Sequence, residues 1–236
     1  MNEPLKGFFV TGTDTEIGKT VVAAGVVRAL AAEGRRIAAM KPVASGAEQT
    51  DAGLRNEDAL HLMAAANVEA GYPEVNPYCF EPPIAPHLAA EEAGISIRPE
   101  VILDSAAALA ARADALVVEG VGGWQVPLAP GFGIPDLARK LKLPVLLVVG
   151  LRLGCINHAR LSVESILASG CNLVGWVGNV ATAEPMAREE ANVGTLKELL
   201  PVPCLGLVPH LAVATPAAVA RHLDVAALED AVYGKR

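Results

Sequence analysis

The segment Gly12-Thr13-Asp14-Thr15-Glu16-Ile17-Gly18-Lys19-Thr20 decides how this chain of 236 residues is expected to fold. It follows the apolar run Phe8-Phe9-Val10 and precedes a helical pattern at residues 21–32. A strand, a turn rich in glycine and threonine, and a helix that opens with Gly-Lys-Thr are together typical of a phosphate-binding loop. The backbone N–H groups of such a loop surround phosphate oxygens, and the helix N-terminus adds the positive end of its dipole.

The last two residues of this loop carry side chains that suit a nucleotide triphosphate. Lys19 can reach the β- and γ-phosphates, and the Thr20 hydroxyl can coordinate Mg²⁺. The spacing is unusual, because five residues separate Gly12 from Gly18 where the common pattern has four. An ordinary glycine turn with an exposed lysine is the alternative, and the flanking strand and helix favour the phosphate loop over it.

The composition is that of a compact globular protein with a well-buried core. Hydrophobic residues make up 52% of the chain, charged residues 19% and aromatic residues only 4%, so Ala, Val and Leu must fill the core, as in parallel sheets covered on both faces. The net charge of −7 argues against a nucleic-acid surface. No apolar run has the length of a membrane span, and we see no secretory signal. We therefore expect a cytoplasmic protein without nucleic-acid or membrane partners.

The four cysteines are scattered and form no C-x-x-C pair, which argues against both a cysteine metal site and a disulfide framework. Short apolar runs alternate with helical patterns, which predicts one α/β domain over residues 1–236 with a mainly parallel sheet and helices on both faces. Strands are expected at residues 7–11, 36–41, 115–119, 145–150, 173–179 and 204–208. Helices are expected near residues 19–33, 58–66, 99–112, 157–169, 186–200 and 216–228. The proline-rich residues 72–87 are expected to form an ordered but irregular loop.

Ligands of open α/β sheets bind beyond the carboxyl ends of the strands, so polar residues at these ends are candidates for a site. Glu119 ends an apolar run and is placed where a second Mg²⁺ ligand usually lies, although it could simply bond to nearby backbone. Gly120, Gly122 and Gly123 follow it and allow a ligand to approach the backbone closely.

Two further charged residues have competing interpretations. Lys41 ends the apolar run at residues 37–40, where it suits an anionic group at a phosphoryl-transfer site or is a structural lysine that extends to solvent. Asp58 most simply favours the first turn of a helix, and it is a metal ligand only if its loop folds over the phosphates. Ser45 could bind a substrate or belong to a plain Ser-Gly turn.

Two asparagines also follow predicted strands. The amide of Asn179 can match the edge of adenine, or the residue can be part of a turn. Asn157 is expected to be the N-cap of the next helix, where free N–H groups at residues 155–158 would suit a carboxylate. Among the five histidines only His210 is expected near the crevice.

In these residues the chain resembles the family of dethiobiotin synthetases, the ATP-dependent carboxylases of biotin synthesis. The family's phosphate loop has the same extra residue as the segment at residues 12–20. The resemblance continues through KPVASG at 41–46, GLRNEDAL at 53–60, VNPY at 75–78, PH at 86–87, EGVGGW at 119–124, LGCINH at 153–158 and GWVGN at 175–179. These blocks span most of the chain in the family's order.

The resemblance implies three groups of site residues, and it makes Lys41 and Lys19 the catalytic lysines. The ATP-binding group comprises Asp14, Thr15, Glu16, Ile17, Gly18, Lys19, Thr20, Val21, Glu119, Gly120, Val121, Gly122, Asn179, Pro209, His210 and Leu211. The group that holds Mg²⁺ comprises Thr20, Asp58 and Glu119. The substrate group comprises Thr15, Lys41, Ser45, Gly122, Gly154, Cys155, Ile156 and Asn157.

The resemblance also implies an assembly and a reaction. Family members are homodimers, in which the segment at residues 154–157 of one subunit meets the substrate carboxylate bound by the other. The substrates are 7,8-diaminononanoate, CO₂ or bicarbonate, and ATP; a carbamate and a carbamic–phosphoric anhydride lead to dethiobiotin, ADP and phosphate. The chain departs from the family at Val121, commonly alanine, and by lacking a tyrosine between residues 179 and 201, which affects the contacts expected to the substrate tail.

Two other classes of protein remain open. Partitioning and division-site ATPases share the broad fold, but they carry a second lysine early in the phosphate loop, where this chain has Thr13 and Asp14. An amidotransferase-type or kinase-like enzyme acting on another small acid is the second alternative.

Overall fold

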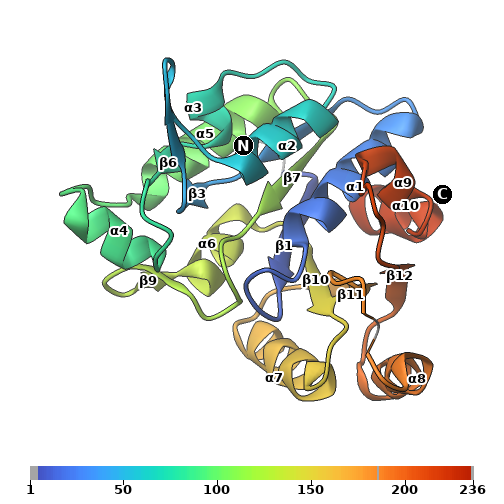
Figure 1. Ribbon diagram of the computed structural model, residues 1–236. Helices are drawn as coiled ribbons and strands as arrows, with labels where there is room; N and C mark the ends of the chain where they lie inside the picture. Colours follow the sequence, from blue (N-terminus) through green and yellow to red (C-terminus); the bar gives the residue numbers. More distant parts are fainter. Residues whose placement is uncertain (1–4, 185, 235–236) are drawn as a thin grey trace.

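A six-stranded parallel sheet forms the centre of the molecule in a computed structural model that describes residues 5–184 and 186–234 (Figure 1). Its strand order is β12-β11-β10-β1-β7-β2, and every pair of neighbours runs parallel. The strands are β1 (Gly7–Gly12), β2 (Ile37–Met40), β7 (Ala115–Glu119), β10 (Val145–Gly150), β11 (Leu173–Asn179) and β12 (Cys204–Val208). All six strands expected from the apolar runs are therefore confirmed, because strands covered on both faces need apolar side chains throughout.

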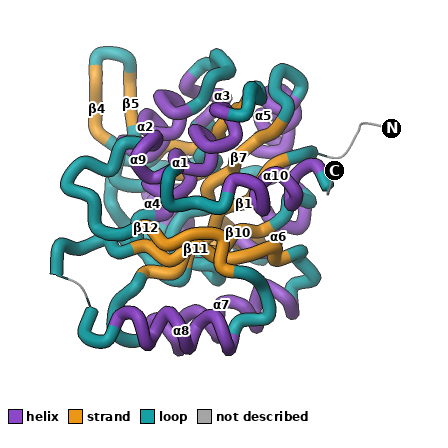
Figure 2. Tube along the Cα trace, turned by 90° about the vertical axis from the view of Figure 1, so that its right-hand side faces the viewer, coloured by secondary structure: helices purple, strands orange, loops and turns teal. Residues whose placement is uncertain are grey.

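Alternate residues of each strand face two separate hydrophobic cores, as the period of two in a strand requires. Phe8 and Val10 pack into one core with α1 (Lys19–Ala32), α2 (Glu57–Ala65), α9 (Pro216–Ala220) and α10 (Val225–Tyr233). Phe9 packs into the other with α5 (Pro99–Ala110), α6 (Ile134–Leu141), α7 (Cys155–Ala168) and α8 (Glu189–Leu199). Figure 2 shows α7 and α8 on one side of the sheet and α1, α9 and α10 on the other. The predicted layering is confirmed.

Three predictions of helices and loops are wrong in detail. The helix expected at residues 216–228 is two helices, because Thr215 and Asp224 each accept a hydrogen bond from a backbone N–H three residues on and start α9 and α10 separately. The eight-residue helix α6 was not expected. The supposedly irregular residues 72–87 contain the short helix α3 (Tyr72–Val75), the strand β6 (Tyr78–Cys79) and the start of α4 (Pro86–Glu92).

The expected N-cap at Asn157 is also wrong. Helix α7 begins two residues earlier, at Cys155, and follows Gly154, whose φ of 97° lies in the left-handed region that glycine tolerates best.

Short strand pairs outside the main sheet shape the loops above its carboxyl edge. They are β3 (Val43–Ala44) with β6, β4 (Glu48–Thr50) with β5 (Gly53–Arg55), and β8 (Pro127–Ala129) with β9 (Phe132–Gly133). None of the helices within residues 5–184 and 186–234 is both long and apolar enough to cross a membrane.

Candidate active site

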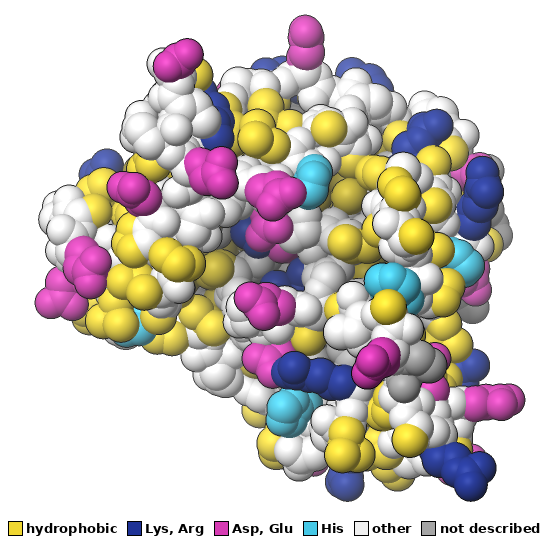
Figure 3. All heavy atoms as spheres, viewed as in Figure 1, with side chains coloured by type: hydrophobic (Ala, Val, Ile, Leu, Met, Phe, Trp, Pro, Cys, Tyr) yellow, Lys and Arg dark blue, Asp and Glu magenta, His cyan; other side chains and the backbone are white. Residues whose placement is uncertain are grey.

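A cavity of about 960 Å³ opens at the carboxyl edge of the sheet, and Figure 3 shows this face hollowed near its centre between basic and acidic side chains. Most residues predicted from the sequence line this cavity. They are Thr15, Glu16, Gly18, Lys19, Thr20, Val21, Lys41, Ser45, Asp58, Glu119, Val121, Gly122, Asn179, Pro209, His210 and Leu211. Because they come from the ends of β1, β2, β7, β11 and β12 and from α2, the fold brings distant parts of the sequence to one place.

The phosphate loop is held in shape by its glycines and by neighbouring strands. Gly18 has a φ of 82°, and a Cβ there would lie only 2.2 Å from Asn179 Nδ2. The unusual extra length of the loop is fixed at Thr13, whose N–H donates to Val148 O at 3.0 Å and whose hydroxyl accepts from Gly150 N–H at 3.4 Å. Thr13 is thus hydrogen-bonded to β10, and the rest of the loop remains free to curve around an anion.

Lys19 lies within this loop as a buried cation. Its Nζ donates to Asp14 O at 2.7 Å. Burial, assisted by the nearby positive charge of Lys41, lowers the pKa of Lys19 to about 8. An anion bound in the loop would counter both effects, so the position suits a phosphate group.

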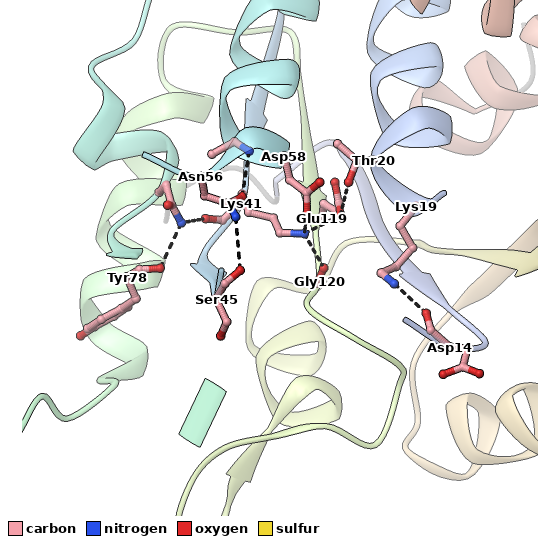
Figure 4. Close-up of polar contacts among 12 residues, drawn as sticks. Asp14, Lys19, Thr20, Lys41, Ser45, Asn56, Asp58, Tyr78, Glu119 and Gly120 are labelled. Carbon is pink, nitrogen blue, oxygen red and sulfur yellow. Dashed lines mark hydrogen bonds and ion pairs between the residues drawn. The ribbon is translucent and has the colours of Figure 1, made fainter. Parts of the chain in front are cut away.

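Lys41 is the centre of a charge cluster in which it and Glu119 are buried while Asp58 faces the cavity at 43% exposure, as Figure 4 shows in close-up. Its Nζ lies 2.5 Å from Glu119 Oε1 and 2.9 Å from Asp58 Oδ2, and Thr20 Oγ1 donates to the same Glu119 oxygen at 2.9 Å. Burial disfavours the charge on Lys41, but the two carboxylates outweigh it and raise the pKa of this lysine. Burial likewise opposes the charge on Asp58, and Lys41 overcomes it and lowers the pKa of Asp58. Lys41 is therefore a charged lysine inside the cavity, and the alternative of a lysine extended to solvent is wrong.

The donor set around Glu119 fits Mg²⁺. Glu119 is fully buried, and its Oε2 has no hydrogen-bond partner among the described residues, which leaves a costly carboxylate oxygen for a ligand. Thr20 and Asp58 add a hydroxyl and a second carboxylate, the hard oxygen ligands that Mg²⁺ prefers. No trio of His, Cys, Asp or Glu forms a metal cage within the described part of the chain. Such a set suits a Mg²⁺ whose remaining ligands are phosphates and water, as in nucleotide enzymes.

Asn179 and Ser45 border the cavity in different ways. Asn179 is buried, and its Nδ2 donates to Ile17 O at 2.8 Å, so this amide braces the phosphate loop. Ser45 Oγ is buried without a hydrogen-bond partner in the part of the chain that the structure describes, which leaves this hydroxyl for a ligand.

Within the described part of the chain, the predicted site residues that do not line the cavity fall into two groups. Asp14, Ile17 and Gly120 do not line it, but their backbone carbonyls accept hydrogen bonds from lining side chains, those of Lys19, Asn179 and Lys41 respectively. The segment at residues 154–157 lies at the start of α7, away from this cavity. The N–H groups of Cys155 and His158 already donate to Arg152 O and Gly154 O, so the expected run of free N–H groups is wrong at both positions.

One part of the cavity wall consists of residues that the sequence did not predict as site residues. It is largely apolar and comprises Pro83, Ile84, Ala85, Pro86, Val126 and Pro127. Gly122 connects this wall to the phosphate loop, because a Cβ there would lie 2.8 Å from Val126 Cγ2 and 3.7 Å from Thr15 Oγ1. The proline run was the available signal, since prolines grouped before a helix fix a loop in one shape.

The chain is similar to several known proteins. Residues 6–218 match a family model described as an AAA domain. A protein of Pseudomonas paraeruginosa named ATP-dependent dethiobiotin synthetase BioD is 56% identical over 222 residues, which cover 94% of this chain and 97% of that protein. A protein of the same name from Aromatoleum aromaticum is 49% identical over 224 residues, covering 94% and 98%. The MinC:MinD cell division protein complex of Aquifex aeolicus contains a similar fold, with a TM-score of 0.56 and 17% identity over 94% of this chain and 88% of that one.

The parallel sheet and the phosphate loop define the class of P-loop nucleotide-binding proteins, as the sequence predicted. The likeness to the cell division complex is a likeness of fold alone. Within the class, the chain belongs to the family of ATP-dependent dethiobiotin synthetases, and it is an enzyme. The resemblance noted in the sequence is thereby confirmed.

Proposed function

We propose that the cavity carries out the ATP- and Mg²⁺-dependent carboxylation and ring closure of 7,8-diaminononanoate with CO₂, giving dethiobiotin, ADP and phosphate. One observation carries the proposal: Lys19, Thr20, Lys41, Asp58 and Glu119 converge on a single cavity that also has an apolar wall. The naming of relatives that are 49–56% identical supports the choice of substrates.

ATP occupies the phosphate-loop side of the cavity in this proposal. The backbone from Asp14 to Val21 and the Lys19 ammonium hold the phosphates, while Pro209, His210 and Leu211 lie beside Asn179 at the adenine end. Thr20, Asp58 and Glu119 would hold Mg²⁺, which neutralises phosphate charge when bound. The unpartnered Glu119 oxygen among the described residues supports this assignment.

The diamine occupies the opposite side, near Thr15, Ser45 and Gly122. The Ser45 hydroxyl has no hydrogen-bond partner among the described residues, so it is free to bond to an amine or a carbamate. The apolar wall at Ile84 and Val126 suits a methylene chain. Lys41 projects between the two sides, where its ammonium can neutralise negative charge on the carbamate and on the transferring phosphoryl group.

The proposed reaction has three steps. One amine adds to CO₂ and loses a proton to give a carbamate. A carbamate oxygen then attacks the γ-phosphorus, and the bond to ADP breaks. The second amine attacks the carbamoyl carbon of the resulting anhydride and loses a proton, and the bond to phosphate breaks as the ring closes. The protein's task is to place the carbamate in line with the γ-phosphate and to stabilise developing charge with Lys19 and Lys41.

We further propose a homodimer in which Gly154, Cys155, Ile156 and Asn157 contact the carboxylate of the substrate bound to the partner subunit. Two observations support this assignment. The segment lies at a helix N-terminus, which favours anions, and the preceding Leu153 is 92% exposed, so this apolar side chain is accessible to a partner subunit.

The function is tested by measuring phosphate release from ATP with diaminononanoate and bicarbonate together and with each alone, and by identifying the product by mass spectrometry. We expect phosphate and dethiobiotin in equal amounts only when both substrates are present. ATP hydrolysis that is unaffected by the diamine would instead indicate a nucleotide-switch ATPase.

A further inference from the structure

We propose that Tyr72 and Asn76 are positioning residues that fix Lys41, Ser45 and Asp58 relative to one another. Neither Tyr72 nor Asn76 is among the described residues that line the cavity. The inference rests on the proposed function, because it concerns the geometry of the same reaction. It starts from a buried polar network behind the cavity wall, carried by the short helix α3 and its two flanking loops.

Asn76 fixes the backbone that carries Lys41. The Asn76 side chain is 3% exposed, and its Nδ2 donates to Lys41 O at 2.7 Å and to Tyr78 O at 3.1 Å. The N–H of Lys41 donates in turn to Val75 O at 2.8 Å. Both backbone polar groups of Lys41 therefore bond to consecutive residues, which leaves the lysine little freedom to shift along the strand end.

Tyr72 connects this support to the helix that carries Asp58. The Tyr72 hydroxyl donates to Asn76 Oδ1 at 2.9 Å and accepts from Asn56 N–H at 2.7 Å, so the single hydroxyl serves as both donor and acceptor. Burial raises the pKa of Tyr72, which keeps the donating proton in place. The Arg55 guanidinium lies 4.2 Å from the centre of the Tyr72 ring and holds the ring from outside.

Asn56 completes the network at the two remaining positions. Its Oδ1 accepts from Ala59 N–H at 3.3 Å and caps α2, whose first turn contains Asp58. Its Nδ2 donates to Ser45 O at 3.3 Å. A continuous series of hydrogen bonds thus runs from Lys41 through Asn76, Tyr72 and Asn56 to the backbones of Ser45 and α2, and buried networks of this kind fix geometry when every member has a partner.

The test compares Tyr72→Phe with Tyr78→Phe. The second change is a matched control, because the Tyr78 hydroxyl accepts from Arg98 N–H at 2.9 Å, on the side of α5 rather than of the site. Tyr72→Phe removes the hydroxyl to which Asn56 N–H donates and which donates to Asn76 Oδ1, so both groups lose a partner. We expect kcat for dethiobiotin formation to fall about ten-fold or more, the scale of a misplacement in a positioned site, and KM for ATP to rise as the Mg²⁺-dependent part of its binding weakens. Tyr78→Phe is expected to keep both constants within about two-fold of those of the unmodified protein, because the one hydrogen bond that it removes lies away from the site.

Two further measurements separate positioning from loss of folding and from failure of the proposed function. Thermal unfolding of both variants should give similar midpoints, so that a difference in kcat is not a difference in folded fraction. Calorimetric binding of a non-hydrolysable ATP analogue, with Mg²⁺ and with EDTA, should show that Tyr72→Phe weakens only the Mg²⁺-dependent part, since Asp58 is displaced. Equal kcat losses in the two variants, or unchanged Mg²⁺-dependent binding in Tyr72→Phe, would overturn the positioning role. If the unmodified protein forms no dethiobiotin, the proposed function fails, and the binding measurement alone then decides the positioning role.

Discussion

The N-termini of helices α1 and α7 are built alike and have different surroundings. Both helices have 14 residues, both follow neighbouring parallel strands, and both begin after a glycine with positive φ, 82° at Gly18 and 97° at Gly154. A Cβ at Gly18 would lie 2.2 Å from Asn179 Nδ2, whereas a Cβ at Gly154 would meet no described atom within 4 Å. The first N-terminus is enclosed by the protein, and the second is open.

Charged side chains, rather than backbone geometry, distinguish the two helix N-termini. At α1 the cations Lys19 and Lys41 and the carboxylates around them line the cavity. At α7 the first turn consists of Cys155, Ile156 and Asn157, none of which is charged. In the proposed function the α1 end binds a triphosphate in its own subunit, and the α7 end offers the positive end of its helix dipole to a carboxylate of the partner's substrate.

The largest effect is expected at the enclosed end, from Lys41→Ala. Removing the ammonium leaves Glu119 buried without its cation, so the free energy of unfolding should fall by about 3–5 kcal/mol. Turnover should fall about 10²–10³-fold, because the charge that stabilises the transferring phosphoryl group is lost. Steady-state kinetics and urea unfolding measure the two effects. Exposed Lys197 on α8 provides the control as Lys197→Ala, and near-normal turnover in Lys41→Ala would remove this lysine from the mechanism.

The two glycines allow the comparison to be tested directly. Gly18→Ala combines an unfavourable φ with a clash against Asn179 and should lower the unfolding free energy by about 2–4 kcal/mol and strongly raise KM for ATP. Gly154→Ala has only the unfavourable φ and should cost about 1–2 kcal/mol. Its KM for the diamine should rise while its KM for ATP does not change. If both variants affect ATP alike, the two helix ends do not have separate ligands.

A smaller effect is expected from the pKa of Lys19. This pKa is about 8 in the folded protein and near 10.5 when unfolded, so the unfolded chain binds more protons between these pH values. Stability without nucleotide should therefore increase as the pH rises from 8 to 10.5. ATP favours the charged lysine, so its affinity should fall above pH 8 by at most ten-fold per pH unit.

Calorimetry in buffers with different heats of ionisation measures the proton that Lys19 takes up on ATP binding near pH 9. The variant Lys19→Met should take up none. An ATP affinity of the unmodified protein that stays constant from pH 7 to 9.5 would contradict the lowered pKa.

The sequence predicted the phosphate loop at the start of α1 far better than it predicted which side chains from other elements lie beside that loop. The phosphate loop is a local pattern. The strands β1 and β10, which are neighbours in the sheet, are buried on both faces, so their apolar runs could be identified without tertiary information. The approach of Asp58 to Lys41 depends instead on how α2 packs and on the Asn56 cap, which are long-range features. The sequence alone therefore favoured the interpretation that Asp58 only stabilises the first turn of a helix.

The open end and the segment behind the cavity show why the remaining predictions were wrong. Asn157 is a good N-cap residue, but the chain begins α7 at Cys155 because Gly154 can adopt a positive φ. Residues 72–87 contain five prolines, which usually indicate irregular loops, yet Pro73 and Pro86 lie in the first turn of a helix, where proline is tolerated. The Tyr72 and Asn76 network lies in this segment and could not be deduced from its composition.

The smallest effect is expected from the ion pair that Arg152 forms with Asp14. Arg152 follows β10 and precedes α7, while Asp14 belongs to the phosphate loop, so the pair connects the enclosed and the open ends. Both side chains are substantially exposed, 58% and 41%, and exposed pairs contribute only about 0–1 kcal/mol. Arg152→Ala should therefore change the unfolding free energy by less than about 1 kcal/mol, and less at high salt than at low salt, since salt screens exposed charges. Denaturant unfolding at two ionic strengths and KM for both substrates measure this. A large rise in both KM values would contradict this, because it would mean that the loss of one weak ion pair alters the binding of both substrates and that the two helix N-termini are coupled.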